Sequence, residues 1–132
     1  MIFSKQTRKG AIIGCLLVLA NFSFVQADIK VYFSPNGGCQ EAVIREISKA
    51  QKSIDIAMYT FTTRDVAQAL VEAINRKVKV RIVLDKAQKN EHYSNSRYLI
   101  SKGFDVKYHL GKGLMHNKFA VIDGTVLLTG SV

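Results

Sequence analysis

The hydrophobic and polar positions of this 132-residue chain change period several times after residue 28. Residues 29–34 are mainly β-branched and aromatic, which predicts a short strand, and the Pro-Asn-Gly-Gly run after them is typical of a loop. Apolar side chains then recur at spacings of three and four over residues 39–52, which predicts a helix. Residues 53–61 return to alternation, which predicts a second strand.

The same alternation of elements continues to the end of the chain. A second helix is expected between a cap at Thr62 or Thr63 and Arg76, and a strand over 78–84. A polar loop, a short helix ended by Gly103, a strand over 104–110 and a hairpin over 115–130 follow. Strands that alternate with helices predict an α/β fold with a mixed, largely parallel sheet flanked by helices.

The first 27 residues have the pattern of an export signal. A basic start precedes an apolar core over 11–20, and residues 25–27 resemble a small-residue cleavage site. We therefore expect residues 28–132 to form one domain that is periplasmic or secreted. Retention of residues 11–27 as a membrane anchor is the alternative.

The charge of residues 28–132 is moderately positive. The whole chain has 19 Lys and Arg against 10 Asp and Glu, and three of the basic residues precede residue 28, which leaves a net charge of +6. This excess suits a polyanionic partner such as nucleic acid. Cys39 is the sole cysteine after residue 27, so neither an internal disulfide nor a cysteine zinc site is expected there.

Two places in this pattern are candidate sites. Asp85 follows the strand at 78–84, where open α/β sheets often bind ligands, and a carboxylate that only caps the strand end is an equally good interpretation. In the final hairpin, Asp-Gly at 123–124 tolerates the positive φ angles of a type I′ turn. A two-residue turn there would make His116 face Ser131 and Lys118 face Thr129.

An imidazole, an ammonium and hydroxyl groups would then converge on one side of the hairpin. Such a patch suits a phosphate, because the cation and the hydroxyls bind its oxygens and a neutral imidazole can attack phosphorus without a metal ion. An ordinary amphipathic hairpin with one half-buried histidine is the alternative. The other histidines, His92 and His109, are expected at the surface.

The hairpin also carries a specific motif. Its spacing, H-x-K-x4-D-x6-G-S, is formed by His116, Lys118, Asp123, Gly130 and Ser131. This motif resembles the signature of the phospholipase D superfamily, and "VYFSPNGGCQEAVIREISKAQKSIDIAMYTFT" and "VKVRIVLD" upstream are similar to its small bacterial Nuc-type endonucleases. The resemblance runs from residue 29 to the end and implies a phospholipase D-like fold.

The resemblance implies a phosphodiesterase without metal or cofactor that works through a phosphohistidine. The candidate catalytic residues are His116, Lys118, Asp123 and Ser131, and the candidate substrate-binding residues are Lys118, Ser131, Thr129 and Lys112. His116 is expected to be the nucleophile, while Lys118 and Ser131 hold the phosphate. We interpret Asp123 as structural, because the hairpin places it at the turn and on the opposite face from His116.

Two further expectations follow from the resemblance. A single motif implies a homodimer with the active site on its two-fold axis, where His116 of each subunit takes one role. The family pattern continues with an asparagine two residues after the serine, another strand and a helix, whereas the printed chain ends at Val132. We therefore expect a truncated domain with an open sheet edge and an uncovered apolar face.

The favoured function is that of a non-specific endonuclease on DNA or RNA. A phospholipase D that hydrolyses phosphatidyl headgroups is the first alternative, although no amphipathic membrane-docking helix is recognised after residue 27. An inactive remnant that still binds polyanions is the second alternative.

Overall fold

The structure is a computed structural model that describes residues 28–131. Its contacts divide the chain into Met1–Lys30 and a compact unit over Val31–Val132, and the described helices and strands belong to the second unit. The predicted export signal over 1–27 lies outside the described residues. None of the helices found between residues 28 and 131 is long and apolar enough to cross a bilayer.

From α1 onward the main helices and strands follow one another in the predicted order, and a 3-10 helix lies within the predicted polar loop. The elements are α1 (Cys39–Lys49), β1 (Ser53–Met58), α2 (Arg64–Asn75), β2 (Lys79–Asp85), the 3-10 helix η2 (Lys86–Lys89), α3 (Ser96–Ser101), β3 (Val106–His109), β4 (Lys118–Ile122) and β5 (Val126–Thr129). Thr63 stands at the N-cap position of α2, although its side chain makes no capping hydrogen bond, and Gly103 adopts a φ of 88° just after α3, as the sequence predicts.

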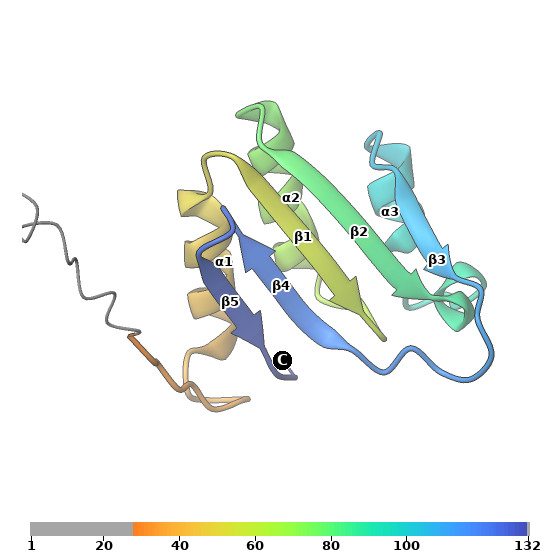
Figure 1. Ribbon diagram of the computed structural model, residues 1–132, viewed down its shortest axis with the longest axis horizontal. Helices are drawn as coiled ribbons and strands as arrows, with labels where there is room; N and C mark the ends of the chain where they lie inside the picture. The colour runs from red at the N-terminus through yellow and green to blue at the C-terminus, as the bar shows by residue number, and fades with distance from the viewer. Residues whose placement is uncertain (1–27, 132) are drawn as a thin grey trace, which may run out of the picture. The chain divides into compact units, whose positions relative to one another are not determined.

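The five strands form one sheet in the order β3-β2-β1-β4-β5 (Figure 1). β1 pairs with β2 and β2 with β3 in parallel, while β4 is antiparallel to both β1 and β5. Because β5 thereby runs in the direction of β1, four of the five strands share one direction. The predicted mixed, largely parallel α/β fold is confirmed.

One face of the sheet carries the core. Figure 1 shows α1, α2 and α3 on the same side of the sheet. Alternate side chains of β1 and β2 point to that side, so Ile54, Ile82 and Leu84 are at most 1% exposed. Each fully buried aliphatic side chain of this kind stabilises the fold by roughly 1.5–3 kcal/mol relative to exposure.

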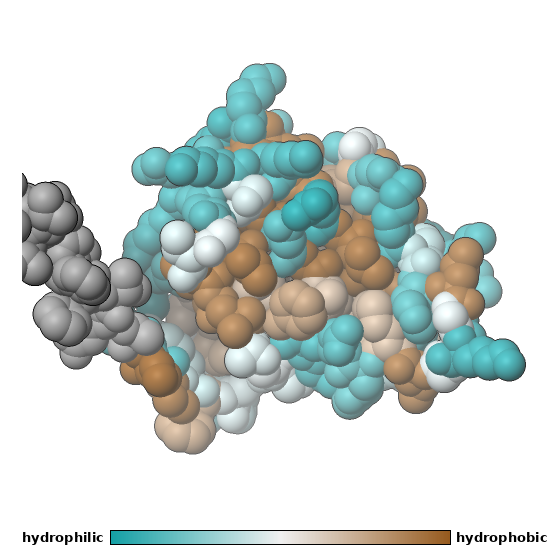
Figure 2. All heavy atoms as spheres, viewed as in Figure 1, coloured by the Kyte–Doolittle hydropathy of each residue, from teal (hydrophilic) through white to brown (hydrophobic). Residues whose placement is uncertain are grey.

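The opposite face of the sheet has no helix over it among residues 31–131 (Figure 1). Figure 2 shows hydrophobic residues gathered over this face with polar residues around them. Phe119 is 37% and Leu127 64% exposed. A 260 Å³ hollow here is lined by Asp55, Ile56, Ala57, Arg81, Val83 and Phe119. Among the described residues, this apolar face therefore has no element packed over it.

The prediction of a strand over 29–34 is wrong. Phe33 makes only isolated bridges to Gly37 and Gly38, and its side chain is 74% exposed. The segment has the composition of a strand, but its bridges close a local turn and no strand of the sheet pairs with it. An extended segment without a neighbouring strand has no ladder to stabilise it.

The hairpin has the predicted turn but a different register. Asp123 and Gly124 have φ angles of 53° and 71°, and the N–H of Thr125 donates to the Ile122 carbonyl at 3.0 Å. The ladder begins with Ile122 opposite Val126, so Thr125 is an additional turn residue. Every pairing is therefore shifted by one residue relative to the prediction.

The shift changes which side chains share a face. Thr129 pairs with Phe119, so the prediction that Lys118 faces Thr129 is wrong. The same register carried onward places Ser131 opposite Asn117, so the predicted pairing of His116 with Ser131 is also wrong.

Candidate active site

The candidate site lies at the end of the sheet where several strands finish. The carboxyl ends of the parallel strands β1, β2 and β3 meet there. Because β4 is antiparallel to β1, its amino end reaches the same edge, and β5 finishes there too. His116 and Ser131, which flank the hairpin, are therefore brought to the edge where open α/β sheets bind ligands.

His116 and Lys118 lie side by side at this edge, as predicted. His116 is exposed and Lys118 is half-buried at the start of β4. The Lys118 Nζ is 3.0 Å from Nε2 and 3.3 Å from Nδ1 of the imidazole. A ring nitrogen that carries no proton can accept from this ammonium, so the imidazole lies next to a positively charged group.

Tyr59 packs against this pair. Its ring centroid is 4.7 Å from that of His116 with a 55° angle between the planes, and the Lys118 ammonium is 5.7 Å from the Tyr59 centroid. The Tyr59 N–H also donates to the Asn117 carbonyl at 2.7 Å. The sequence analysis missed Tyr59, because this contact exists only through the pairing of β4 with the distant β1.

The remaining substrate-binding candidates are exposed. Ser131 follows β5, and Lys112 lies in the loop between β3 and β4. Thr129 directs its hydroxyl to the Lys118 carbonyl, where Oγ1 donates at 3.2 Å. Within residues 28–131 no hydrogen bond joins the Ser131 or Lys112 side chain to His116. The structure thus brings His116 and Lys118 together, and the roles of the other three stay predictions.

Asp123 has the structural environment that we predicted. Its carboxylate accepts from the backbone N–H groups of Ser53 at 2.9 Å, Gln51 at 3.0 Å and Lys52 at 2.7 Å. These N–H groups, with that of Ser53 first, hold the pKa of the Asp123 carboxyl below its usual value. The carboxylate joins the hairpin turn to the α1–β1 connection, at the end of β4 away from His116.

Asp85 is a strand-end cap, which was one of its two interpretations. Its side chain is fully buried at the end of β2. Oδ1 accepts from the Ala87 N–H at 2.9 Å, and Oδ2 accepts from the Met115 N–H at 2.8 Å. The two N–H groups, first Ala87 and then Met115, lower the pKa of the Asp85 carboxyl.

The two other histidines differ from each other. His92 is exposed, as expected. His109 pairs with Asp85 in the β2–β3 ladder and is half-buried, and its Nδ1 has no hydrogen-bond partner, so the surface prediction for it is wrong. Between residues 28 and 131 no three His, Cys, Asp or Glu side chains gather in a way that could hold a metal ion.

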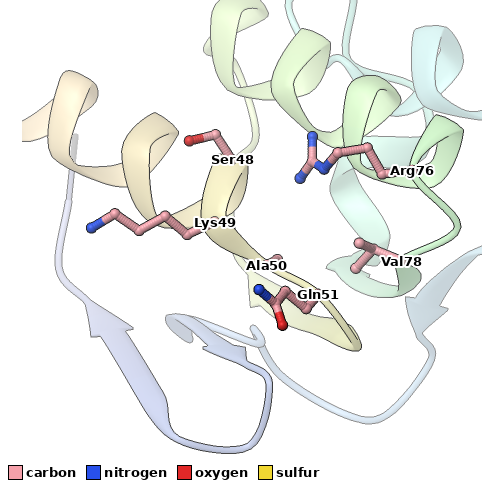
Figure 3. A pocket seen from close by; sticks show the side chains of 6 residues that line it. All are labelled: Ser48, Lys49, Ala50, Gln51, Arg76 and Val78. Atoms are coloured by element: carbon pink, nitrogen blue, oxygen red, sulfur yellow. The ribbon is translucent and has the colours of Figure 1, made fainter.

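A hollow of about 530 Å³ lies elsewhere and does not include the candidate residues (Figure 3). It is lined by Ser48, Lys49, Ala50, Gln51, Arg76 and Val78. Arg76, which directly follows α2, lines the hollow and donates to the Ile47 carbonyl at 3.0 Å. The hollow borders the Asp123 contacts at the start of β1, so it lies at the opposite end of the sheet from His116.

Comparison with known proteins identifies the family. A family model described as "Cardiolipin synthase, PLD-like domain" matches residues 43–132, which is more than half of the chain. The chain belongs to the phospholipase D-like family. This family of phosphodiesterases was expected from the motif that includes His116 and Lys118.

Curated relatives from bacteria and animals agree. The chain is 32% identical over 106 residues to a phospholipase D of Rickettsia prowazekii, which covers 80% of this chain and 52% of the relative. It is 40% identical over 83 residues to a mitochondrial cardiolipin hydrolase of Xenopus laevis, which covers 63% of this chain and 40% of the relative. The chain therefore spans about half the length of the curated relatives that it matches.

Solved structures support the fold. Nuc from Salmonella typhimurium, a phospholipase D family member, superposes with a TM-score of 0.72 at 30% identity, covering 78% of this chain and 69% of Nuc. NucT from Helicobacter pylori superposes with a TM-score of 0.58 at 30% identity, covering 67% of this chain and 62% of NucT. The predicted phospholipase D-like fold is confirmed.

Proposed function

We propose that this protein is a metal-independent phosphodiesterase that cleaves DNA or RNA without sequence preference through a phosphohistidine intermediate. The observation that supports it most directly is the exposed His116 imidazole with the Lys118 ammonium 3.0 Å away, where the carboxyl ends of the parallel strands meet. Expected to be exported, it would act in the periplasm or outside the cell.

The residues have distinct roles in the proposed reaction. A neutral His116 nitrogen attacks phosphorus, and the bond from phosphorus to the leaving oxygen breaks. Lys118 compensates the charge on the non-bridging oxygens, and the Ser131 hydroxyl donates to them. Water then attacks the phosphohistidine and passes a proton to the group that protonated the leaving oxygen. The bond from phosphorus to the imidazole nitrogen breaks, which releases the second product and the free imidazole.

The leaving oxygen needs a proton from a second group. The chain has three histidines in all. His92 is exposed in the loop after η2, and His109 is half-buried and lies beneath the backbone of Gly111. The resemblance to the phospholipase D superfamily implies a site shared by two copies of a single motif, so we propose that His116 of a second subunit is the general acid, in a homodimer whose two-fold axis passes through the site.

Charge supports nucleic acid as the substrate. The net charge of +6 over residues 28–132 favours a polyanion through release of its counterions. Lys112, exposed in the loop before β4, adds a cation to the segment that leads to His116. No base-reading module is recognised in the sequence, so contacts to the phosphates are expected to dominate and sequence preference to be weak.

A phospholipid is the second candidate substrate, and one observation favours it. Leu110 is 83% and Leu114 66% exposed in the loop that leads to His116. Exposed leucines around a basic residue such as Lys112 suit the surface of an anionic bilayer. The names of the Rickettsia and Xenopus relatives point in the same direction.

One assay separates these substrates. Purified full chain is incubated with plasmid DNA, with a single-stranded RNA and with phosphatidylcholine vesicles that also contain an anionic phospholipid, each with and without a chelator. We expect cleavage of the nucleic acids that the chelator does not change. Release of choline alone would replace the nuclease proposal with the phospholipase one, loss of activity with chelator would overturn both, and binding without turnover would indicate an inactive remnant.

The proposed dimer needs its own test. Wild-type chain is mixed with a His116→Asn chain in increasing proportion, after the subunits have been allowed to exchange. If each site uses one histidine from each subunit, activity should fall faster than the wild-type fraction, because mixed dimers lack one of the two imidazoles. A decline in simple proportion to the wild-type fraction would contradict the shared site.

A further inference from the structure

We propose that Asp85 is a positioning residue for His116, acting through the Met115 backbone amide. This inference deepens the proposed function, because it names what holds the nucleophile in place. Asp85 is not itself a catalytic residue, since neither of its oxygens bonds to His116. The mechanism above makes no use of Asp85, although it is a fully buried acid beside the site.

The two hydrogen bonds of Asp85 serve different segments. Oδ1 binds the Ala87 amide within the turn that begins η2, which is the local cap expected of an aspartate at this place. Oδ2 binds the Met115 amide, 30 residues further along the chain. A buried carboxylate is costly unless its oxygens are bonded, so the second bond ties the conformation of a distant loop to the end of β2.

The loop that Asp85 holds leads directly to the nucleophile. Leu110, Lys112 and Leu114 are exposed along it, whereas Met115 is only 9% exposed. The loop is also close to β3 at Gly111, where an added Cβ would lie 2.6 Å from His109 Nε2. The bond from Met115 to Asp85 is the last fixed point before the exposed His116.

We therefore expect a displacement of the Met115 backbone to move His116 as well. The two residues are adjacent, and consecutive Cα atoms are only about 3.8 Å apart. On the other side, Tyr59 contacts the imidazole and bonds to the Asn117 carbonyl. His116 thus lies between two backbone anchors. A misplacement of about 1 Å at a reacting group costs roughly 100-fold in rate.

The kinetic test uses Asp85→Asn in the full chain. The new amide has nearly the same shape, but its NH2 cannot accept from one of the two N–H groups. We expect kcat on oligonucleotide to fall about 10- to 100-fold at a temperature where both proteins are folded, with KM changed less than about threefold. Asp55→Asn is the matched control, since Asp55 pairs with Arg81 on the uncovered face, and its kcat should stay within about twofold.

A second measurement does not depend on activity. Nuclear Overhauser contacts between the Tyr59 and His116 rings, and the amide shift of Met115, are compared in wild type, Asp85→Asn and Asp55→Asn. We expect Asp85→Asn to weaken the ring contact and move the Met115 amide, and Asp55→Asn to change neither. An unchanged ring contact in Asp85→Asn, or an equal loss of kcat in both variants, would overturn the proposal.

The two proposals fail in distinguishable ways. If wild-type chain cleaves no phosphodiester, the proposed function is wrong, and the ring contact still decides whether Asp85 positions His116. If Asp85→Asn does not fold, hydrogen exchange in the wild type decides. The Met115 amide should then exchange much more slowly than that of exposed Leu114, and equal rates would overturn the proposal.

Discussion

Asp85 and Asp123 use the same chemistry at opposite ends of the sheet. Each is an aspartate whose carboxylate accepts only backbone N–H groups, two at Asp85 and three at Asp123. Asp123 joins the hairpin turn to the start of β1, where the next residue is the buried Ile54 of the core. Asp85 joins the end of β2 to the loop before β4, and what lies beside it is His116.

The comparison shows that hydrogen bonding alone does not identify a functional carboxylate. Both groups have a lowered pKa, and backbone amides are the main cause for both. Asp123 belongs to the family motif, whereas Asp85 does not. The next residue after each tethered amide is what distinguishes them, since Met115 is followed by the candidate nucleophile and Ser53 by the buried Ile54.

Low pH should produce the largest loss of stability, because it protonates the Asp85 and Asp123 carboxylates together. The folded pKa of each lies below the ordinary value of about 3.9, so each stabilises the fold fully above that value. This stability is lost as the pH falls through the lowered pKa. We expect the unfolding temperature to be nearly constant from about pH 7 to 5 and to fall below about pH 4.

Circular dichroism melts across this range provide the measurement. The double variant Asp85→Asn/Asp123→Asn is the control, and its melting temperature should depend less on pH below about 4. A decline that begins near pH 6, or the same acid dependence in the double variant, would contradict the assignment to these two carboxylates.

Asp123→Asn should come next and should act on stability. Asparagine tolerates the positive φ of Asp123, so the substitution isolates the loss of the charged acceptor. We expect the unfolding temperature to fall by about 5 to 10 °C. Per folded molecule, kcat should fall less than in Asp85→Asn. A smaller loss of stability and a larger loss of kcat than in Asp85→Asn would reverse the comparison.

Substitution of Tyr59 should have the smallest effect and should act on activity. The ring contact with His116 is of a kind worth about 0.5–1.5 kcal/mol. Tyr59→Leu should therefore lower kcat about three- to tenfold, and Tyr59→Phe, which keeps the ring, should retain most of it. Steady-state kinetics on the same oligonucleotide measure both. Equal losses would show that the hydroxyl, not the ring contact, matters.

The local features of the fold were predictable from the sequence. Periodicity located α1, β1, α2 and β2, because each element buries one regular face against the same core. The Asp-Gly pair predicted positive φ angles at 123 and 124 because few other residues tolerate them. His116 and Lys118 were paired correctly because side chains two positions apart lie on one side of an extended segment.

The features that failed depend on partners distant in the chain. The strand predicted over 29–34 has suitable residues but no neighbouring strand. The hairpin register was misjudged by one residue, because an Asp-Gly turn permits the extra Thr125 and only the packing of both strands decides it. Tyr59 reaches the site through strand pairing, which leaves no local pattern. Asp85 was a candidate from its place at the strand end, but its bond to the Met115 amide is a loop contact that the sequence does not show.

Covalent trapping of the intermediate tests the central claim most directly. The full chain is mixed with a short labelled oligonucleotide, quenched in base to preserve phosphohistidine, digested and analysed by mass spectrometry. We predict an adduct on His116 that persists in His92→Ala, whose exposed imidazole belongs to the loop after η2, and disappears in His116→Ala. Turnover without an adduct on His116, or an adduct that survives His116→Ala, would contradict the account.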